Sequence, residues 1–219
     1  LLMSSMNLSE ASKRKMDILS DLSGPDLSSG FESYYSGYLL QEEQKLVIAK
    51  TWYAGEMSRP GCVWTHSLLI ALSDKEAALF QIDKLLSLFK RPEKLSGNSG
   101  YSEPLQIISG NILRCKTDEK KMKYLLWVML GNPPPCIVLC HNSDDFITEL
   151  LSIWLMCYDD LPVDYSFITG ALSIRSDSTK NLSLQFSPKE LRNKVFHSGK
   201  NIGVMKEIDE IQKFPSWVS

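Results

Sequence analysis

Two strand-forming runs separated by a short loop constrain the fold more than any other feature of the chain. Residues 45–53 and 62–72 are both rich in β-branched and aromatic side chains, which favour strands. The loop between them, residues 54–61, carries glutamate, arginine, proline and glycine and is longer than the tightest hairpin turns. The two runs therefore predict a hairpin-like pair of strands, and hence a β-sheet.

Helix and strand patterns alternate along the rest of the chain. Residues 136–140 form a continuous apolar run between turn signals, which predicts a strand buried on both faces. Apolar spacing, Ser-x-x-Glu and proline signals predict helices over 9–22, 74–90, 118–130, 143–158 and after Ser187. Further strands are predicted at 165–175 and, across a Ser/Asp turn, at 182–186, whereas 31–38 is interpreted as an aromatic connector. This succession predicts an α+β protein, with helices packed on a mixed β-sheet.

One large domain accounts for most of the 219 residues. We assign residues 1–198 to an α+β domain. Residues 199–219 carry Val204, Ile208 and Ile211 at helical spacing, so we predict a C-terminal helical extension or a lead into a following domain. Because the chain opens on Leu1, we also expect the natural sequence to begin further upstream.

Charge and cysteine usage exclude several classes of function. The formal net charge of −2 supplies no field that would gather nucleic acid or anionic lipid. No apolar run approaches the roughly 18 residues that a membrane span requires. The five cysteines are odd in number and lie in apolar runs, which is typical of reduced, buried thiols. We therefore predict a cytoplasmic protein that binds neither membrane nor nucleic acid.

The sequence offers no convincing cofactor or metal site. Gly199-Lys200 is followed by asparagine, so the phosphate-binding loop pattern fails. Cys62 and His66 would lie about 13 Å apart along a strand, too far to share one zinc ion. We predict no bound cofactor and no metal.

His66 is the candidate for catalysis, if the protein is an enzyme. A hydrolase could pair His66 with a cysteine or a carboxylate from the second half of the chain, because such partners need not be neighbours in sequence. The alternative interpretation is a histidine at the polar margin of a packed strand face, shared with Cys62, Trp64 and Leu68. We favour the second interpretation, and we predict no catalytic residue.

The 54–61 loop is the preferred surface for recognition, since loops on a rigid sheet often carry binding residues. Arg59 is the first candidate, because its planar fork suits carboxylate or phosphate groups. An ion pair between Arg59 and Glu56 that shapes the loop is an alternative, and so is an arginine finger that completes a GTPase site. The predicted partner-binding residues are Trp52, Tyr53, Glu56, Arg59, Trp64 and His66.

Four segments carry a resemblance to a known family. They read LSDLSG (19–24), GFESYYSGYLL (30–40), AKTWYAGEMSRPGCVWTHSLLI (49–70) and LLSLFKRP (85–92). In order and spacing they resemble the N-terminal domain of the bacterial GTPase-associated protein one family. Members of that family usually begin with a segment containing Gly-Tyr and Gly-His, which this chain lacks before Leu1.

The resemblance implies a multidomain cytosolic protein encoded beside a GTPase in bacterial conflict systems that resist phage. Its partners would be that GTPase and further domains of the same protein. The family supplies no established catalytic residues to carry over. On this basis we expect an adaptor or sensor module, with a hydrolase using His66 as the alternative.

Overall fold

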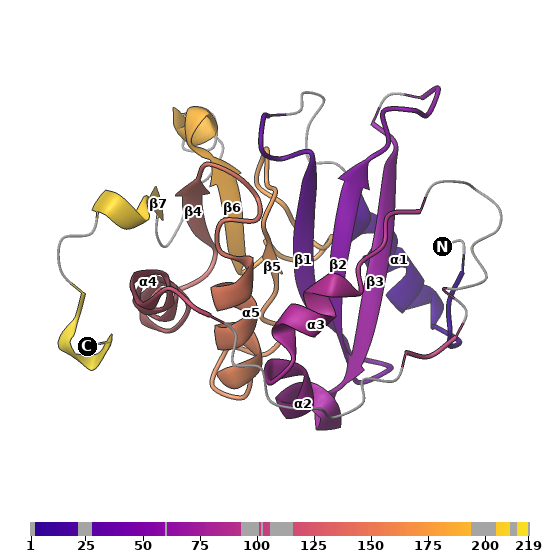
Figure 1. The fold of residues 1–219 in the computed structure, drawn as a ribbon, viewed down its shortest axis with the longest axis horizontal. Coiled ribbons are helices and arrows are strands. Elements are labelled where there is room, and N and C mark those ends of the chain that lie inside the picture. Colours follow the sequence, from indigo (N-terminus) through magenta and orange to yellow (C-terminus); the bar gives the residue numbers. More distant parts are fainter. Residues whose placement is uncertain are drawn as a thin grey trace.

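The computed structural model describes residues 3–21, 28–59, 61–92, 101, 103–105, 116–193, 205–210 and 214–218. Within these ranges the strands form a seven-stranded sheet in the order β3-β2-β1-β5-β6-β4-β7 (Figure 1). The helices are α1 (Glu10–Ser20), α2 (Lys75–Leu79), α3 (Ile82–Ser87), α4 (Glu119–Gly131) and α5 (Ile147–Met156). The strands are β1 (Ser33–Leu40), β2 (Lys45–Tyr53), β3 (Val63–Ala71), β4 (Cys136–Cys140), β5 (Phe167–Ile168), β6 (Leu184–Pro188) and β7 (Met205–Lys206).

The sheet is mixed, which confirms the predicted α+β class. Strands β3, β2, β1 and β5 pair antiparallel, whereas β5, β6, β4 and β7 pair parallel. Helices α2 to α5 cover one face and α1 covers the other (Figure 1). No helix in the described part of the chain is both long enough and apolar enough to cross a membrane.

Strand β4 lies between β6 and β7 and is buried throughout, as its apolar run predicts. Parallel strands covered on both faces leave no position for a solvated side chain, so the alternation typical of half-exposed strands disappears. Strand β7, which follows residue 198, pairs with β4 in the register Ile137↔Met205. The division into residues 1–198 and 199–219 stays a proposal.

The prediction of a connector at 31–38 is wrong, because Ser33–Leu40 is strand β1. This strand pairs with β2 along its whole length and with β5 at Ser36↔Ile168 and Gly37↔Phe167. Tyr34 faces the α1 side and Tyr35 faces the α2–α5 side, and both are buried. A central strand whose two faces are both covered carries large side chains on each face. Its sequence therefore lacks the alternation of apolar and polar residues that identifies a half-exposed strand.

The single helix predicted at 74–90 is interrupted. The chain forms a short 3-10 turn at Leu72–Asp74, then α2, and then α3 after a non-helical residue, Gln81, with φ −133° and ψ 31°. The hydroxyl of Ser73 donates to the Asp74 carboxylate at 3.1 Å, and no side chain caps α2, so the capping-box prediction is wrong. Helices α2 and α3 both pack against the common core, and we attribute the interruption to this packing.

The strand predicted at 165–175 is also shorter than expected. Only Phe167–Ile168 joins the sheet, and β5 and β6 run parallel instead of pairing across a turn. At Arg175 the side chain of Gln185 takes the place of a neighbouring strand. It accepts from Arg175 N–H at 2.8 Å and donates to Arg175 C=O at 3.0 Å. Pro188 closes β6 and is followed by the 3-10 helix Lys189–Leu191, after which Arg192 and Asn193 are α-helical. The rest of the helix predicted after Ser187 lies outside the described residues.

Helix α1 is held on its face of the sheet by polar side chains at both ends. Glu43 accepts from Ser9 N–H at 2.8 Å and from the Ser12 hydroxyl, which anchors the start of the helix. The buried Arg175 side chain donates to the carbonyls of Ile18 at 2.8 Å and Asp21 at 2.6 Å, which satisfies the end of the helix.

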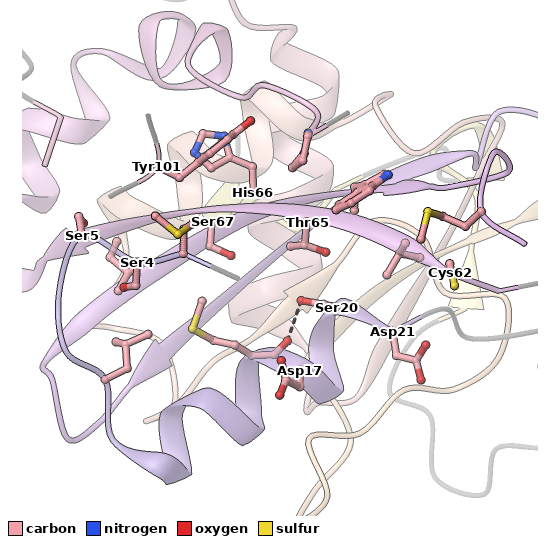
Figure 2. A pocket seen from close by; sticks show the side chains of 18 residues that line it. Ser4, Ser5, Asp17, Ser20, Asp21, Cys62, Thr65, His66, Ser67 and Tyr101 are labelled. Atoms are coloured by element: carbon pink, nitrogen blue, oxygen red, sulfur yellow. Dashed lines mark hydrogen bonds between the residues drawn. The ribbon is translucent and has the colours of Figure 1, made fainter. Parts of the chain in front are cut away.

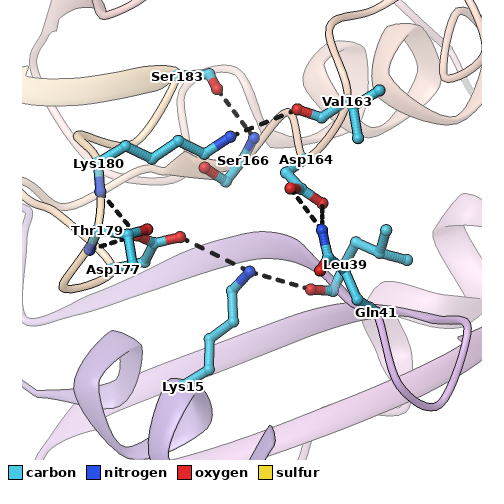
Figure 3. Close-up of polar contacts among 10 residues, drawn as sticks. All are labelled: Lys15, Leu39, Gln41, Val163, Asp164, Ser166, Asp177, Thr179, Lys180 and Ser183. Carbon is cyan, nitrogen blue, oxygen red and sulfur yellow. Dashed lines mark hydrogen bonds and ion pairs between the residues drawn. The ribbon is translucent and has the colours of Figure 1, made fainter. Parts of the chain in front are cut away.

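Further polar contacts connect the first strands with the 163–180 region (Figure 3). Lys15 donates to the carbonyl of Leu39 at 3.1 Å and lies 3.7 Å from the Asp177 carboxylate. Gln41 donates to Asp164 at 2.7 Å. These contacts support the seam where β1 meets β5.

Candidate functional site

The 54–61 loop is closed at its base by the backbone. Ala54 N–H donates to the carbonyl of Cys62 at 2.9 Å, and Met57 N–H donates to Ala54 C=O at 3.0 Å within the loop. Gly61 has φ +82°, in the left-handed region that favours glycine, so the Arg-Pro-Gly turn depends on this residue. Pro60 lies outside the described residues.

Glu56 is the centre of the polar contacts in the loop. Its carboxylate accepts a hydrogen bond from Trp64 Nε1–H at 2.7 Å, and Arg91 Nη2 lies 2.7 Å from both carboxylate oxygens. The same Arg91 nitrogen donates to Tyr53 C=O at 3.2 Å. The loop is thereby joined to both of its flanking strands and to the segment after α3. We call Glu56, Trp64 and Arg91 the Glu56 clamp.

The ion pair of Glu56 is made by Arg91, not by Arg59 as the alternative from sequence supposed. Thirty-five positions separate Glu56 from Arg91, so no local pattern indicates the contact. The Lys90-Arg91-Pro92 run, which lies in a segment that resembles the family, was the only signal available. Arg59 is exposed, and among the described residues its side chain makes no hydrogen bond or ion pair.

Hydrogen bonds to the carboxylate lower the pKa of Glu56 to about 2. A hydrogen bond from its own backbone N–H is the largest cause, followed by the hydrogen bonds from Arg91 and Trp64. Hydrogen bonds to the charged form stabilise it over the protonated acid. The clamp therefore keeps its charge throughout the physiological pH range.

We expect the Glu56 carboxylate to titrate near pH 2, and Arg91→Ala to move the midpoint toward the ordinary value of 4.5. Because the folded-state pKa is depressed, the stabilisation from Glu56 is complete above about pH 4.5 and is lost as the pH falls toward 2. The measurement is a ¹³C NMR titration of the carboxyl carbon, with the exposed Glu42 as an internal reference. An unchanged midpoint in Arg91→Ala would contradict the assigned contact.

The predicted contact residues divide into an exposed and a buried group. Glu56 and Arg59 are exposed, whereas Trp52, Tyr53 and His66 are half-buried. Trp64 is only 6% exposed and lies opposite Trp52 in the β2–β3 pair. Trp64 therefore offers a partner little surface. Its indole N–H instead holds Glu56 through a hydrogen bond.

His66 is half-buried on β3 and lies among aromatic side chains. Its Nδ1 accepts a hydrogen bond from Lys90 N–H at 3.1 Å, and its ring makes edge contacts with Phe89 and Tyr101. Burial, and then the charge of Lys90, lower the pKa of His66, which favours the neutral imidazole. No contact within the described residues joins His66 to a carboxylate or a thiol.

Among the described residues, no cysteine forms a hydrogen bond with His66. Cys136, Cys140 and Cys157 are buried, and burial raises the pKa of Cys140 and of Cys157. Cys62 is half-buried and lies on the same strand run as His66, about 13 Å away by strand geometry. Cys115 lies outside the described residues. Within the described residues, no group of three or more His, Cys, Asp or Glu side chains could hold a metal ion.

A cavity of about 500 Å³ adjoins the clamp at the outer side of β3 (Figure 2). Helix α1 forms one wall, through Met16, Asp17 and Ser20. Strand β3 forms another through residues 63–67 and 69, and the rest of the lining includes Met57 of the loop and residues 3–5. The loop, α1 and β3 therefore form one continuous surface, which sequence reasoning did not predict.

Comparison with known protein families gives one match. Residues 1–90 match the model of GTPase-associated protein 1, N-terminal domain type 1. The matched residues contain α1, β1, β2, β3, α2 and α3, and thus the loop and most of the cavity wall. Searches of the curated proteins and of the solved structures gave no significant match.

Proposed function

We propose that this chain is a non-enzymatic adaptor or sensor module that couples a GTPase to an effector in a bacterial anti-phage conflict system. The matched family is named for association with a GTPase, which supports a GTPase as the partner. In this proposal the partner contacts the 54–61 loop and its aromatic flanks. The protein acts in the cytoplasm together with further domains of the same polypeptide.

The observation that carries the proposal is the exposed Arg59 on a loop ordered by the Glu56 clamp. Binding costs conformational entropy when a loop must become ordered, and a loop already fixed at Glu56 avoids part of that cost. Arginine is enriched among the residues that contribute most to interfaces. A pre-ordered loop with an exposed guanidinium is therefore suited to binding a partner.

The chemistry of Arg59 selects an acidic group on the partner. The guanidinium donates two parallel hydrogen bonds to a carboxylate, and such charge-assisted pairs are stronger than neutral ones. Because Arg91 already neutralises Glu56 within the loop, Arg59 is available to a carboxylate of the partner. We therefore place an aspartate or a glutamate of the GTPase opposite the loop tip.

We expect Arg59→Ala to weaken binding of the neighbouring GTPase at least about tenfold, because arginine is enriched among the few interface residues whose truncation costs about 2 kcal/mol or more. The measurement is a pull-down of the purified GTPase with the full-length protein, followed by titration calorimetry. Arg14→Ala is the matched control, since Arg14 is an exposed arginine on α1 and does not line the cavity. Equal affinity of folded Arg59→Ala and unchanged protein would remove this residue from the interface.

A further inference from the structure

Strand β3 is an edge strand with one open side. It pairs with β2 along all nine residues, from Val63↔Tyr53 to Ala71↔Lys45, and lies at the end of the strand order. The other side of β3 makes no backbone pairing with any described residue. Edge strands present a row of free N–H and C=O groups that can pair with another chain.

The hydrogen bonds at the two ends of β3 show which groups face outward. Ala54 N–H donates to Cys62 C=O at 2.9 Å, and Leu72 N–H donates to Gln44 C=O at 3.4 Å. In an antiparallel pair every second residue directs both backbone groups at its partner strand. Even-numbered residues from 62 to 72 therefore face β2, and the backbone groups of Val63, Thr65, Ser67 and Leu69 face the open side.

Strand β3 itself, which the structure describes in full, lacks three of the features that prevent pairing at an edge. Protein edges are blunted by lysine, by proline or by a bulge. Strand β3 has the sequence VWTHSLLIA, without a charged residue or a proline, and its register with β2 is continuous, without a bulge. A long, uncharged and regular edge is suited to adding a strand.

The cavity lies against the outward-facing residues. Val63, Thr65, Ser67 and Leu69 all contribute to its lining. The side chains of Thr65 and Ser67 point toward α1 (Figure 2), and Leu69 packs against the cluster on that side of the sheet. Leu8 and Met16 add apolar surface on the opposite wall. An extended segment paired with β3 would direct every second side chain into this space.

The charges around the cavity restrict what can enter it. Asp17 and Asp21 line it, and among the described residues no lysine or arginine does. This lining repels phosphate groups and favours neutral or positively charged side chains. The cavity therefore suits a polypeptide with apolar and basic residues better than a nucleotide.

We propose that the open edge of β3 binds an extended segment of a partner protein by strand addition, with alternate apolar side chains in the cavity and a lysine or arginine near Asp17 and Asp21. The inference deepens the proposed function, on which it rests for the existence of a protein partner. It assigns the form of the recognised segment, whereas the 54–61 loop supplies a separate contact. Main-chain hydrogen bonds would give affinity and the cavity would give specificity.

The test uses short random peptides displayed on phage and selected against the full chain, with the strongest binder synthesised as the probe. We expect selected peptides to alternate apolar residues and to carry more Lys and Arg than Asp and Glu. Ser67→Pro removes one outward N–H and leaves the bonds to β2 intact, and proline is tolerated at such edge positions. Ser67→Ala, which keeps the N–H, is the matched control.

Ser67→Pro should weaken probe binding at least about tenfold, with Ser67→Ala close to the unchanged protein. Hydrogen exchange followed by NMR gives a second readout. The amides of Val63, Thr65, Ser67 and Leu69 should gain protection in the complex, while those of Trp64 and His66 are protected with and without the probe. Full binding by folded Ser67→Pro, or protection without this alternation, would overturn strand addition.

Three further outcomes are distinguishable. If Ser67→Pro instead converts a dimer of the free chain into a monomer, the edge pairs with a second copy, and the assignment to a partner fails. Probe binding that needs the Ser67 N–H, together with GTPase binding that ignores Arg59, would refute the loop contact and support strand addition. GTPase binding that needs Arg59, without peptide binding at β3, would refute strand addition alone.

Discussion

Replacing Trp154 by alanine is expected to lower the free energy of unfolding by about 3–5 kcal/mol, the usual cost of removing a buried tryptophan. Trp154 lies on α5, is fully buried, and makes an edge contact with Phe167 at 5.2 Å between ring centroids. Its Nε1–H also donates to Tyr165 C=O at 3.2 Å. The substitution would open a cavity between α5 and β5 and leave a buried carbonyl without its donor. Chemical denaturation followed by circular dichroism measures the loss.

Two variants separate the contributions of Trp154. Trp154→Phe keeps an aromatic ring and loses the hydrogen bond, so it should cost about 1–3 kcal/mol. Met156→Ala on the same helix is the control, because Met156 is 53% exposed and a surface change there should stay within about 0.5 kcal/mol. A loss below 1 kcal/mol in Trp154→Ala would show that α5 does not pack as described.

Adding one methyl group at Gly37 is expected to destabilise the protein by about 3 kcal/mol, at the upper end of the cost of overpacking a core. A Cβ atom at Gly37 would lie 2.1 Å from Cε1 and 2.4 Å from Cζ of Phe167. Phe167 is fully buried against Trp154, so its ring has little room to move away. Gly37 and Phe167 are also register partners in the β1–β5 pair, so Gly37→Ala should strain the seam of the sheet.

A double-mutant cycle tests this explanation. Phe167→Leu removes the ring that meets the new methyl group, so Gly37→Ala should cost much less in that background than alone. The free energies of unfolding of the four proteins provide the coupling between the two sites. Strict additivity would show that Gly37 is required for a reason other than contact with Phe167.

The seam between β1 and β5 joins the antiparallel half of the sheet to the parallel half. Residues 1–90 match the family domain and supply the antiparallel half of the sheet, whereas β4, β5 and β6 follow that match and pair parallel. Thr169 strengthens the join, since its Oγ1 accepts from Tyr35 N–H at 2.8 Å and its own N–H donates to Tyr35 C=O at 2.8 Å. We propose that residues 1–198 unfold as one unit, and the Gly37 variant tests whether damage at the seam is transmitted to both halves.

Some of the fold could be predicted because local patterns were strong. The β2–β3 pair has β-branched and aromatic runs on both sides of a turn-forming loop, and the predicted 45–53 strand agrees with β2 at both ends. The apolar run 136–140 predicted β4 as a strand buried on both faces. Helices α1, α4 and α5 followed from apolar spacing within each segment, although α5 begins at Ile147, without a side-chain cap, and not at Ser143.

Other features depended on distant parts of the chain. The aromatic run at 31–38 became a strand only because β2 and β5 supply partners on both of its sides. The helix predicted at 74–90 was interrupted because α2 and α3 each pack into the shared core. Gln185 likewise satisfied the backbone of Arg175 and replaced the strand predicted there.

The sequence by itself determined the presence of a sheet, its α+β class and a charged loop between two aromatic strands, because these follow from period, propensity and turn chemistry within short windows. Only the tertiary structure decided that Arg91 pairs with Glu56, that Arg59 is left exposed, and that the outer edge of β3, unpaired among the described residues, lies beside a cavity. Such features arise where segments far apart in sequence meet, and hydrophobic periodicity carries no information about which segments become neighbours.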